Sequence, residues 1–213
     1  MVSTLRDYQL WHQAYDDPDS GLSWRLGKVQ GFLRHALDRH HGSIRMVSVC
    51  AGDGRDLIGV LAERDDADRV SAALIELHPQ IAQRARDTAA AAGLQRIEVR
   101  TVDAGNTDAY LGLVPADVVL LVGVFGNISD NDLQRTIDTA PQLCAPGATL
   151  LWSRGRDRDD RNDTIRARFV ETGFTELDYA PRDSGSRPAV GVMRYDGDPQ
   201  ILIEGRRLFT FLR

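Results

Sequence analysis

The chain has 213 residues, of which 42% are hydrophobic and 27% charged, and its formal net charge is −5. This length and apolar content suit a single globular domain with a full core, and the acidic balance argues against non-specific nucleic-acid binding. Two cysteines, Cys50 and Cys144, indicate neither a disulfide framework nor a zinc site, and no signal peptide or long apolar span is evident. We therefore expect a cytoplasmic protein without a metal ion.

The first 43 residues are expected to form a helical segment ahead of a main domain at 44–213. Spacings of three and four residues place four side chains on one face of a short helix: Tyr8, Trp11, His12 and Tyr15. That face either packs on the core or forms a lid over a bound ligand. A second helix is predicted between Leu22 and Leu37, where apolar residues recur at helical spacing.

The most informative stretch is Arg45–Asp56, with the sequence RMVSVCAGDGRD. An apolar run ends at Cys50, a glycine-bearing turn follows, and an apolar helix begins near Leu57. Strand, glycine turn and helix form the opening unit of a doubly wound α/β domain, which binds ligands at the carboxyl ends of its strands. We expect Gly52 and Gly54 to let a ligand approach the backbone, beside the free N–H groups of the helix.

Acidic residues end the next two predicted strands. The run Val70–Leu77 carries Glu76, about 20 residues past the glycines, where a carboxylate can hold ribose hydroxyls. The run Ile97–Val102 is followed by Asp103. Two such acids after a glycine turn are far more specific than the turn alone.

Together these strand ends resemble class I S-adenosylmethionine-dependent methyltransferases, over roughly residues 44–213. The chain also resembles small bacterial methyltransferase-like proteins that carry CAGDGRD and GVFGNIS. The resemblance implies a Rossmann-like α/β fold: a doubly wound, mostly parallel, seven-stranded sheet with helices on both faces and an antiparallel last strand. Two positions depart from the family pattern, since Ser48 stands where an acid is usual and Cys50 where a glycine is usual.

The resemblance further implies S-adenosyl-L-methionine as cofactor and S-adenosyl-L-homocysteine as product. In the family, the glycine turn faces the methionine end, the second-strand acid takes the ribose hydroxyls, and the third-strand acid takes the adenine amino group. Carried over by position, the cofactor-binding residues are Cys50, Ala51, Gly52, Asp53, Gly54, Glu76, Leu77, Asp103, Ala104, Gly123 and Val124.

A second glycine turn follows the fourth predicted strand, Asp117–Val122, and is expected to stand opposite the first. Asn127 in this turn is a catalytic candidate together with His12, although Asn127 equally suits a turn or a helix start. The candidate substrate-binding residues are Tyr8, Trp11, Tyr15, Phe125 and Arg154. The turn lacks the Asp/Asn-Pro-Pro-Tyr/Phe motif of enzymes that methylate adenine or glutamine amino groups.

The remaining elements alternate between helices and strands. Helices are expected near 129–140 and 163–172, and strands at 148–152 and 174–179. The run Val190–Tyr195 is either a strand or a cover at the edge of the site. The final run, Arg207–Leu212, is predicted as the edge strand that closes the sheet.

Three functions fit this pattern. The first is transfer of a methyl group to a small-molecule acceptor, without nucleic-acid or membrane partners, by a monomer or homodimer. The second is a nicotinamide-dependent oxidoreductase, although its fingerprint requires a third glycine where Leu57 stands. The third is a binding or regulatory protein that keeps the fold and binds the cofactor without catalysis.

Overall fold

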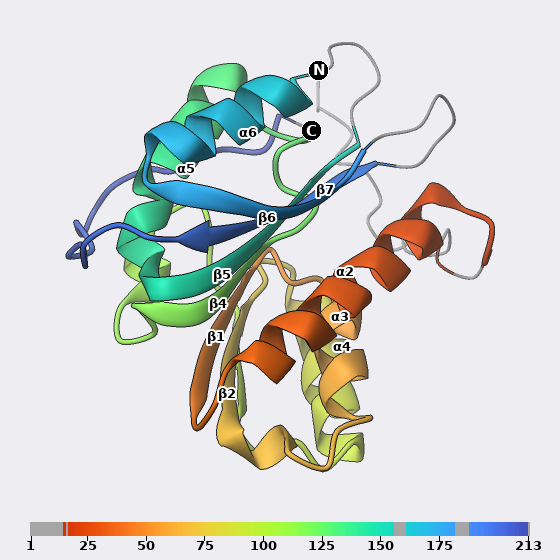
Figure 1. The fold of residues 1–213 in the computed structure, drawn as a ribbon. Helices are drawn as coiled ribbons and strands as arrows, with labels where there is room; N and C mark the ends of the chain where they lie inside the picture. The colour runs from red at the N-terminus through yellow and green to blue at the C-terminus, as the bar shows by residue number, and fades with distance from the viewer. Residues whose placement is uncertain (1–14, 16, 156–160, 182–187, 213) are drawn as a thin grey trace.

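The computed structural model describes residues 15, 17–155, 161–181 and 188–212, and Figure 1 shows a central sheet with helices on both faces. The predictions for Tyr8, Trp11 and His12 lie outside the described residues. Among the residues that are described, no helix is long and apolar enough to cross a membrane.

The sheet has seven strands in the order β3-β2-β1-β4-β5-β7-β6. Strands β1 to β5 pair in parallel, whereas β7 runs antiparallel between β5 and β6. The predicted fold class is therefore confirmed. The strand bounds are β1 Ile44–Val49, β2 Val70–Ile75, β3 Ile97–Arg100, β4 Ala116–Leu121, β5 Cys144–Arg154, β6 Phe174–Ala180 and β7 Ala189–Tyr195.

Alternating side chains of the central strands fill two separate cores. In β1, Met46 packs into one apolar cluster and Val47 into the other, and both side chains are fully buried. In β4, Leu120 and Leu121 divide in the same way. A parallel strand with helices on both sides is apolar at every position, which is why these strands read as continuous apolar runs.

Helices α2 (Gly21–Arg39), α3 (Arg55–Leu61) and α4 (Pro79–Ala91) contribute to one core, and α5 (Asp130–Leu143) and α6 (Asn162–Glu171) to the other. Two short 3-10 turns lie at 67–69 and 107–110. Local chemistry sets the helix starts. The hydroxyl of Ser129 accepts the backbone N–H of Asp132 at 3.1 Å, and Pro79 occupies the first turn of α4.

The final run is not an edge strand, so the prediction for Arg207–Leu212 is wrong. The antiparallel seventh strand is instead β7, and residues 206–212, here called the C-terminal strap, lie against the segments that follow β3 and β4. The backbone N–H of Leu208 donates to Gly105 O at 2.8 Å, and that of Leu212 donates to Asn127 O at 2.8 Å. The strap finds its hydrogen-bond partners in these loops and in side chains of α5 rather than in a neighbouring strand, since Thr210 N donates to Asp132 Oδ2 at 3.1 Å.

Candidate functional site

A cavity of about 840 Å³ lies at the carboxyl ends of the central strands, and its size falls in the range typical of small-molecule sites. It brings together Gly52, Glu76 and Asp103, which follow three different strands. Of the eleven cofactor-binding residues expected from the sequence, the cavity is lined by Cys50, Ala51, Gly52, Asp53, Glu76, Leu77, Asp103, Ala104 and Gly123.

The turn after β1 begins with a residue in the left-handed region, because Cys50 has a φ of 53°. A non-glycine residue there is strained, which gives a physical reason for the glycine that the resembling family usually has at this position. Burial, reinforced by the nearby carboxylates of Glu76 and Asp103, raises the pKa of the Cys50 thiol well above its ordinary value. The thiol is therefore neutral at physiological pH and is no nucleophile.

Gly54 has a different role from the one expected. Its φ is +73°, and a Cβ added to it would lie 2.4 Å from Leu74 Cδ2 and 2.8 Å from Ile58 Cδ1. Both neighbours are buried core residues, and Gly54 does not line the cavity. The residue thus allows α3 to pack closely against β2, which is the task of the last glycine in such turns.

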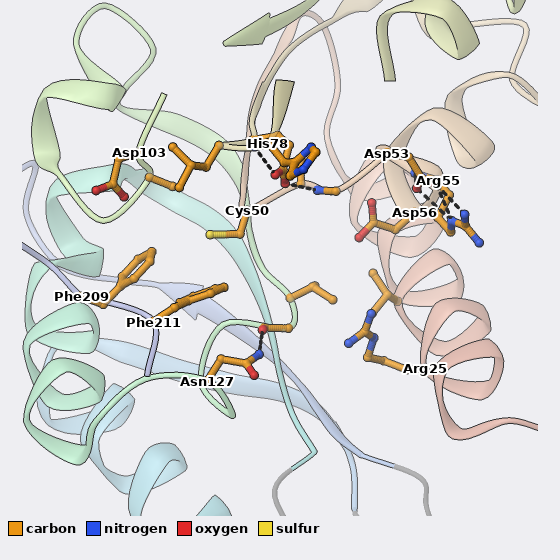
Figure 2. Close-up of a pocket in the computed structure, with 18 of the residues that line it drawn as sticks. Arg25, Cys50, Asp53, Arg55, Asp56, His78, Asp103, Asn127, Phe209 and Phe211 are labelled. Carbon is orange, nitrogen blue, oxygen red and sulfur yellow. Dashed lines mark hydrogen bonds and ion pairs between the residues drawn. The ribbon is translucent and has the colours of Figure 1, made fainter. Parts of the chain in front are cut away.

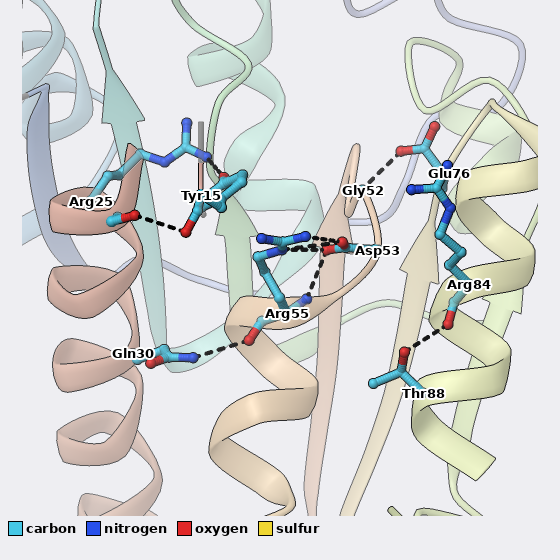
Figure 3. A network of polar contacts seen from close by, with 10 residues as sticks. Tyr15, Arg25, Gln30, Gly52, Asp53, Arg55, Glu76, Arg84 and Thr88 are labelled. Carbon is cyan, nitrogen blue, oxygen red and sulfur yellow. Dashed lines mark hydrogen bonds and ion pairs between the residues drawn. The ribbon is translucent and has the colours of Figure 1, made fainter. Parts of the chain in front are cut away.

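The carboxylate of Glu76 is fixed by two backbone groups. It accepts hydrogen bonds from Gly52 N at 3.0 Å (Figure 3) and from His78 N at 2.8 Å. A carboxylate has lone pairs for further donors, so Glu76 can still accept ligand hydroxyls. Beside it, the buried Nδ1 of His78 has no hydrogen-bond partner among the described residues, and Leu77 lies 64% exposed on the cavity wall.

Asp103 forms an ion pair that the sequence did not suggest. Its Oδ1 accepts Gly105 N at 2.8 Å, and its Oδ2 lies 2.5 Å from Nη1 of Arg207 in the C-terminal strap. Nearly half of each side chain is exposed to solvent, so this pair adds little to stability and mainly orients the carboxylate.

The strap also supplies aromatic side chains to the cavity. Phe209 and Phe211 stack with ring centroids 5.7 Å apart, and both line the cavity with Thr210 (Figure 2). The close approach depends on Gly105, because a Cβ added there would lie 2.3 Å from Phe209 O. Sequence reasoning missed these residues because a short apolar run at this position is equally typical of an edge strand.

The opposite wall is polar and comes from α2 and α3. Arg25 of α2 donates a hydrogen bond to the hydroxyl of Tyr15. Tyr15, one of the aromatic residues predicted to bind substrate, therefore lies at the cavity and lines it. Arg55 pairs with Asp53, with Nε 2.9 Å from Oδ1, and its guanidinium lies 4.2 Å from the centroid of the Tyr15 ring (Figure 3). Helix α2 is thereby tied to the glycine turn through one tyrosine.

Asp56 also belongs to this wall, and its place in the first turn of α3 complements the positive end of the helix dipole. Its side chain lines the cavity, and its Oδ1 accepts Leu57 N at 2.9 Å (Figure 2). Burial raises the pKa of Asp56 above its ordinary value, and the positive charge of Arg25 opposes that shift without cancelling it. Asp56 is thus a carboxyl whose ionisation depends on what occupies the cavity.

The turn after β4 divides its residues between the cavity and the core. Gly123 and Asn127 line the cavity, and the amide Nδ2 of Asn127 donates to Gly123 O at 2.7 Å. Val124 and Phe125 are buried away from the cavity, and the Phe125 ring lies 6.2 Å from that of Trp152. Phe125 is therefore a core residue and not a pocket residue.

Arg154 also lies away from the cavity. It is the last residue of β5 and is buried, with 3% of its surface exposed. The structure therefore does not bring Arg154 to a position from which it could pair with an acceptor in this cavity. Among the described residues, no group of three His, Cys, Asp or Glu side chains is arranged to hold a metal ion.

The cavity fits the cofactor that the resemblance implies. Four carboxyl groups and three guanidinium groups line it, from Asp53, Asp56, Glu76 and Asp103 and from Arg25, Arg55 and Arg207. These seven groups, when all are ionised, carry one net negative charge, which complements the net positive charge of a sulfonium amino acid. The buried Nδ1 of His78, beside Glu76, has no hydrogen-bond partner among the described residues, so a polar atom of the cofactor could supply one.

Comparison with known proteins supports this reading. Residues 20–156 match the model of a family described as putative methyltransferases. No curated protein matches the chain.

Solved structures share the fold. An O-methyltransferase family protein from Burkholderia thailandensis superposes with a TM-score of 0.66 at 18% identity, covering 90% of this chain, which spans only 61% of that relative. Magnesium protoporphyrin IX methyltransferase from Synechocystis PCC 6803, with bound SAM, gives 0.69 at 13% identity, covering 90% and 92% of the two chains. Fibrillarin, a pre-rRNA processing protein of Methanococcus jannaschii, gives 0.58 at 17%, covering 73% and 68%. Identities this low establish the fold alone.

Proposed function

This chain belongs to the family of putative methyltransferases, and we propose that it transfers a methyl group from S-adenosylmethionine to an oxygen or nitrogen of a small-molecule acceptor. The observation that carries this proposal is the convergence of the glycine turn, Glu76 and Asp103 on one cavity. If these three strand ends faced different surfaces of the protein, the structure would not support the proposal. The product left on the protein is S-adenosylhomocysteine.

Each end of the cofactor has a complement among the cavity residues. Glu76, fixed by two backbone N–H groups, would hold the ribose hydroxyls, and Asp103, oriented by Arg207, would accept the adenine amino group. Leu77 and Ala104 would lie beside the adenine ring, and Gly52 would let the chain of the methionine end approach the backbone.

The cofactor, when bound, supplies a methyl group activated by a positive sulfonium. The residues of this chain then have to hold the acceptor in line with that methyl group and keep water out. The two cavity walls support this role, because the C-terminal strap with Phe211 faces the α2–α3 wall with Arg25 (Figure 2). Such a partly enclosed space with an aromatic side suits a small molecule that carries an apolar ring.

Proton removal is needed only for acceptors that must lose a proton during the attack. His12 remains the candidate base predicted from the sequence. Asn127 remains a candidate for orienting the acceptor, although its Nδ2 already donates to Gly123 O. A carboxylate acceptor would need no base.

Calorimetry tests the proposal directly. We expect S-adenosylmethionine and S-adenosylhomocysteine to bind with micromolar dissociation constants and NAD not to bind. Asp103→Asn should weaken that binding, whereas Asp87→Asn, an exposed carboxylate on α4, should leave it unchanged. Binding of neither sulfur nucleoside would refute the proposal. Binding without methyl transfer to a broad acceptor panel would favour a regulatory protein instead.

A further inference from the structure

Two charged side chains on the α2–α3 wall are assigned no ligand group in the function proposed above. Arg25 is buried, with 9% of its surface exposed, and its guanidinium lines the cavity. Asp56 lines the same wall from the first turn of α3. Figure 2 shows the two on one side of the cavity, with Asp103, Phe209 and Phe211 on the other.

The other acidic side chains of the cavity have defined partners within the chain. Asp53 pairs with Arg55, Asp103 pairs with Arg207, and Glu76 accepts two backbone N–H groups. Asp56 differs, because the hydrogen bond that it accepts comes from the adjacent backbone N–H of Leu57. It is the carboxylate of this cavity with the most capacity to receive a cationic ligand group.

Arg25 contacts the turn after β4 directly and is connected to the turn after β1 through Tyr15. A Cβ added to Gly123 would lie 3.3 Å from Nη1 of Arg25, so the guanidinium lies against the backbone after β4. Tyr15 fixes the other side of the guanidinium by accepting a hydrogen bond from Nη2. The Tyr15 ring is itself held under Arg55, which is paired with Asp53 of the first turn. A buried arginine held in this way is a preorganised anion site.

We propose that Arg25 and Asp56 form a clamp for an α-amino-acid group, in which Arg25 binds the carboxylate and Asp56 binds the ammonium. The inference rests on the proposed function, since S-adenosylmethionine has one adenosine end and one zwitterionic end. With the adenosine end at Glu76 and Asp103, the zwitterionic end lies toward Arg25 and Asp56. Tyr15 acts as a positioning residue for Arg25.

The ionisation of Asp56 is consistent with this role. Burial raises the pKa of the Asp56 carboxyl although the positive charge of Arg25 opposes the shift, and an ammonium group at hydrogen-bond distance would favour the charged form. An ion pair completed only by the ligand makes binding selective for molecules that carry the whole amino-acid group.

Three ligands separate the two charges in calorimetry. S-adenosylhomocysteine carries both charged groups, its decarboxylated analogue, an adenosyl thiopropylamine, carries only the ammonium, and 5′-methylthioadenosine carries neither. Arg25→Gln should lower the affinity for S-adenosylhomocysteine about tenfold or more, because charge-assisted hydrogen bonds are stronger than neutral ones. The affinities for the other two ligands should stay within about twofold of the wild-type values. Asp56→Asn should lower the affinity for both ammonium-bearing ligands by about as much and leave the affinity for 5′-methylthioadenosine unchanged.

Arg34→Gln serves as the control, because Arg34 lies on α2 and pairs with Glu63 at the surface. Should Arg25→Gln fail to fold, Arg25→Lys keeps the charge but changes its geometry, and it should still weaken S-adenosylhomocysteine selectively. If the Arg25 and Asp56 variants lost affinity equally for all three ligands, or lost none for S-adenosylhomocysteine, the clamp would be overturned while the proposed function would stand. Failure of the wild-type protein to bind any of the three ligands would instead overturn the proposed function and the clamp with it.

Discussion

The contact between Gly105 and the C-terminal strap allows a sharp test of how the cavity wall is built. In Gly105→Ala the new Cβ would meet the backbone oxygen of Phe209 at 2.3 Å, well inside ordinary contact near 3.4 Å. A backbone oxygen cannot move aside by changing a rotamer, so the strap must shift by roughly 1 Å. That shift also strains the hydrogen bond from Leu208 N to Gly105 O.

The expected cost combines two effects. Overpacking contributes about 1–3 kcal/mol, and the weakened hydrogen bond contributes about 1 kcal/mol. We therefore expect Gly105→Ala to lower the free energy of unfolding by about 2–4 kcal/mol. Binding of S-adenosylhomocysteine should weaken as well, because the strap carries Arg207, the partner of Asp103.

Equilibrium unfolding in urea measures the first effect, and calorimetry measures the second. Gly27→Ala is the control, since a Cβ at this α2 position meets nothing within 4 Å. That variant should gain about 0.5–1 kcal/mol, the usual helix preference of alanine over glycine. If Gly105→Ala proved as stable as the wild-type protein, the described path of the strap would be wrong.

Three further outcomes are expected. Gly54→Ala should lose about 1–3 kcal/mol more than Gly93→Ala, since both have φ near +72° but only Gly54 faces packed side chains; equal losses in urea unfolding would contradict this. Glu76→Gln should weaken S-adenosylhomocysteine about tenfold in calorimetry with a near-normal melting temperature, and unchanged affinity would count against the ribose assignment. Burial raises the pKa of Asp56 in the folded protein above its value in the unfolded chain. The folded protein therefore loses stability as the pH rises from the unfolded pKa to the folded pKa. Asp56→Asn should therefore be more stable than wild type at neutral pH, with the gain fading below about pH 4; a gain that grew on acidification would reverse the sign of this argument.

The aromatic side of the described cavity comes from a part of the chain that the sequence analysis did not single out as part of the site. The sequence suggested a lid from the N-terminal segment, and Tyr15 of that segment does line the cavity. Residues at the other end of the chain, Phe209 and Phe211, provide the aromatic side of the described cavity. The N-terminal lid itself stays a prediction.

The sequence by itself determined the features that depend on neighbours along the chain. The run Met46–Cys50, the glycine turn and the following helix are consecutive, so their order already indicates a strand–turn–helix unit. Glu76 and Asp103 each follow a buried strand, and parallel strands bring their carboxyl ends to one edge of the sheet. The convergence of these residues on one cavity follows from topology that the pattern predicts.

Only the tertiary structure decided which contacts join residues distant in the chain. Asp103 and Arg207 are 104 positions apart, and nothing local marks them as partners. The short apolar run at 207–212 suits an edge strand as well as a strap, and the choice depends on hydrogen-bond partners supplied by Gly105 and Asn127. Local preference leaves such alternatives close in free energy, so packing against remote residues selects between them.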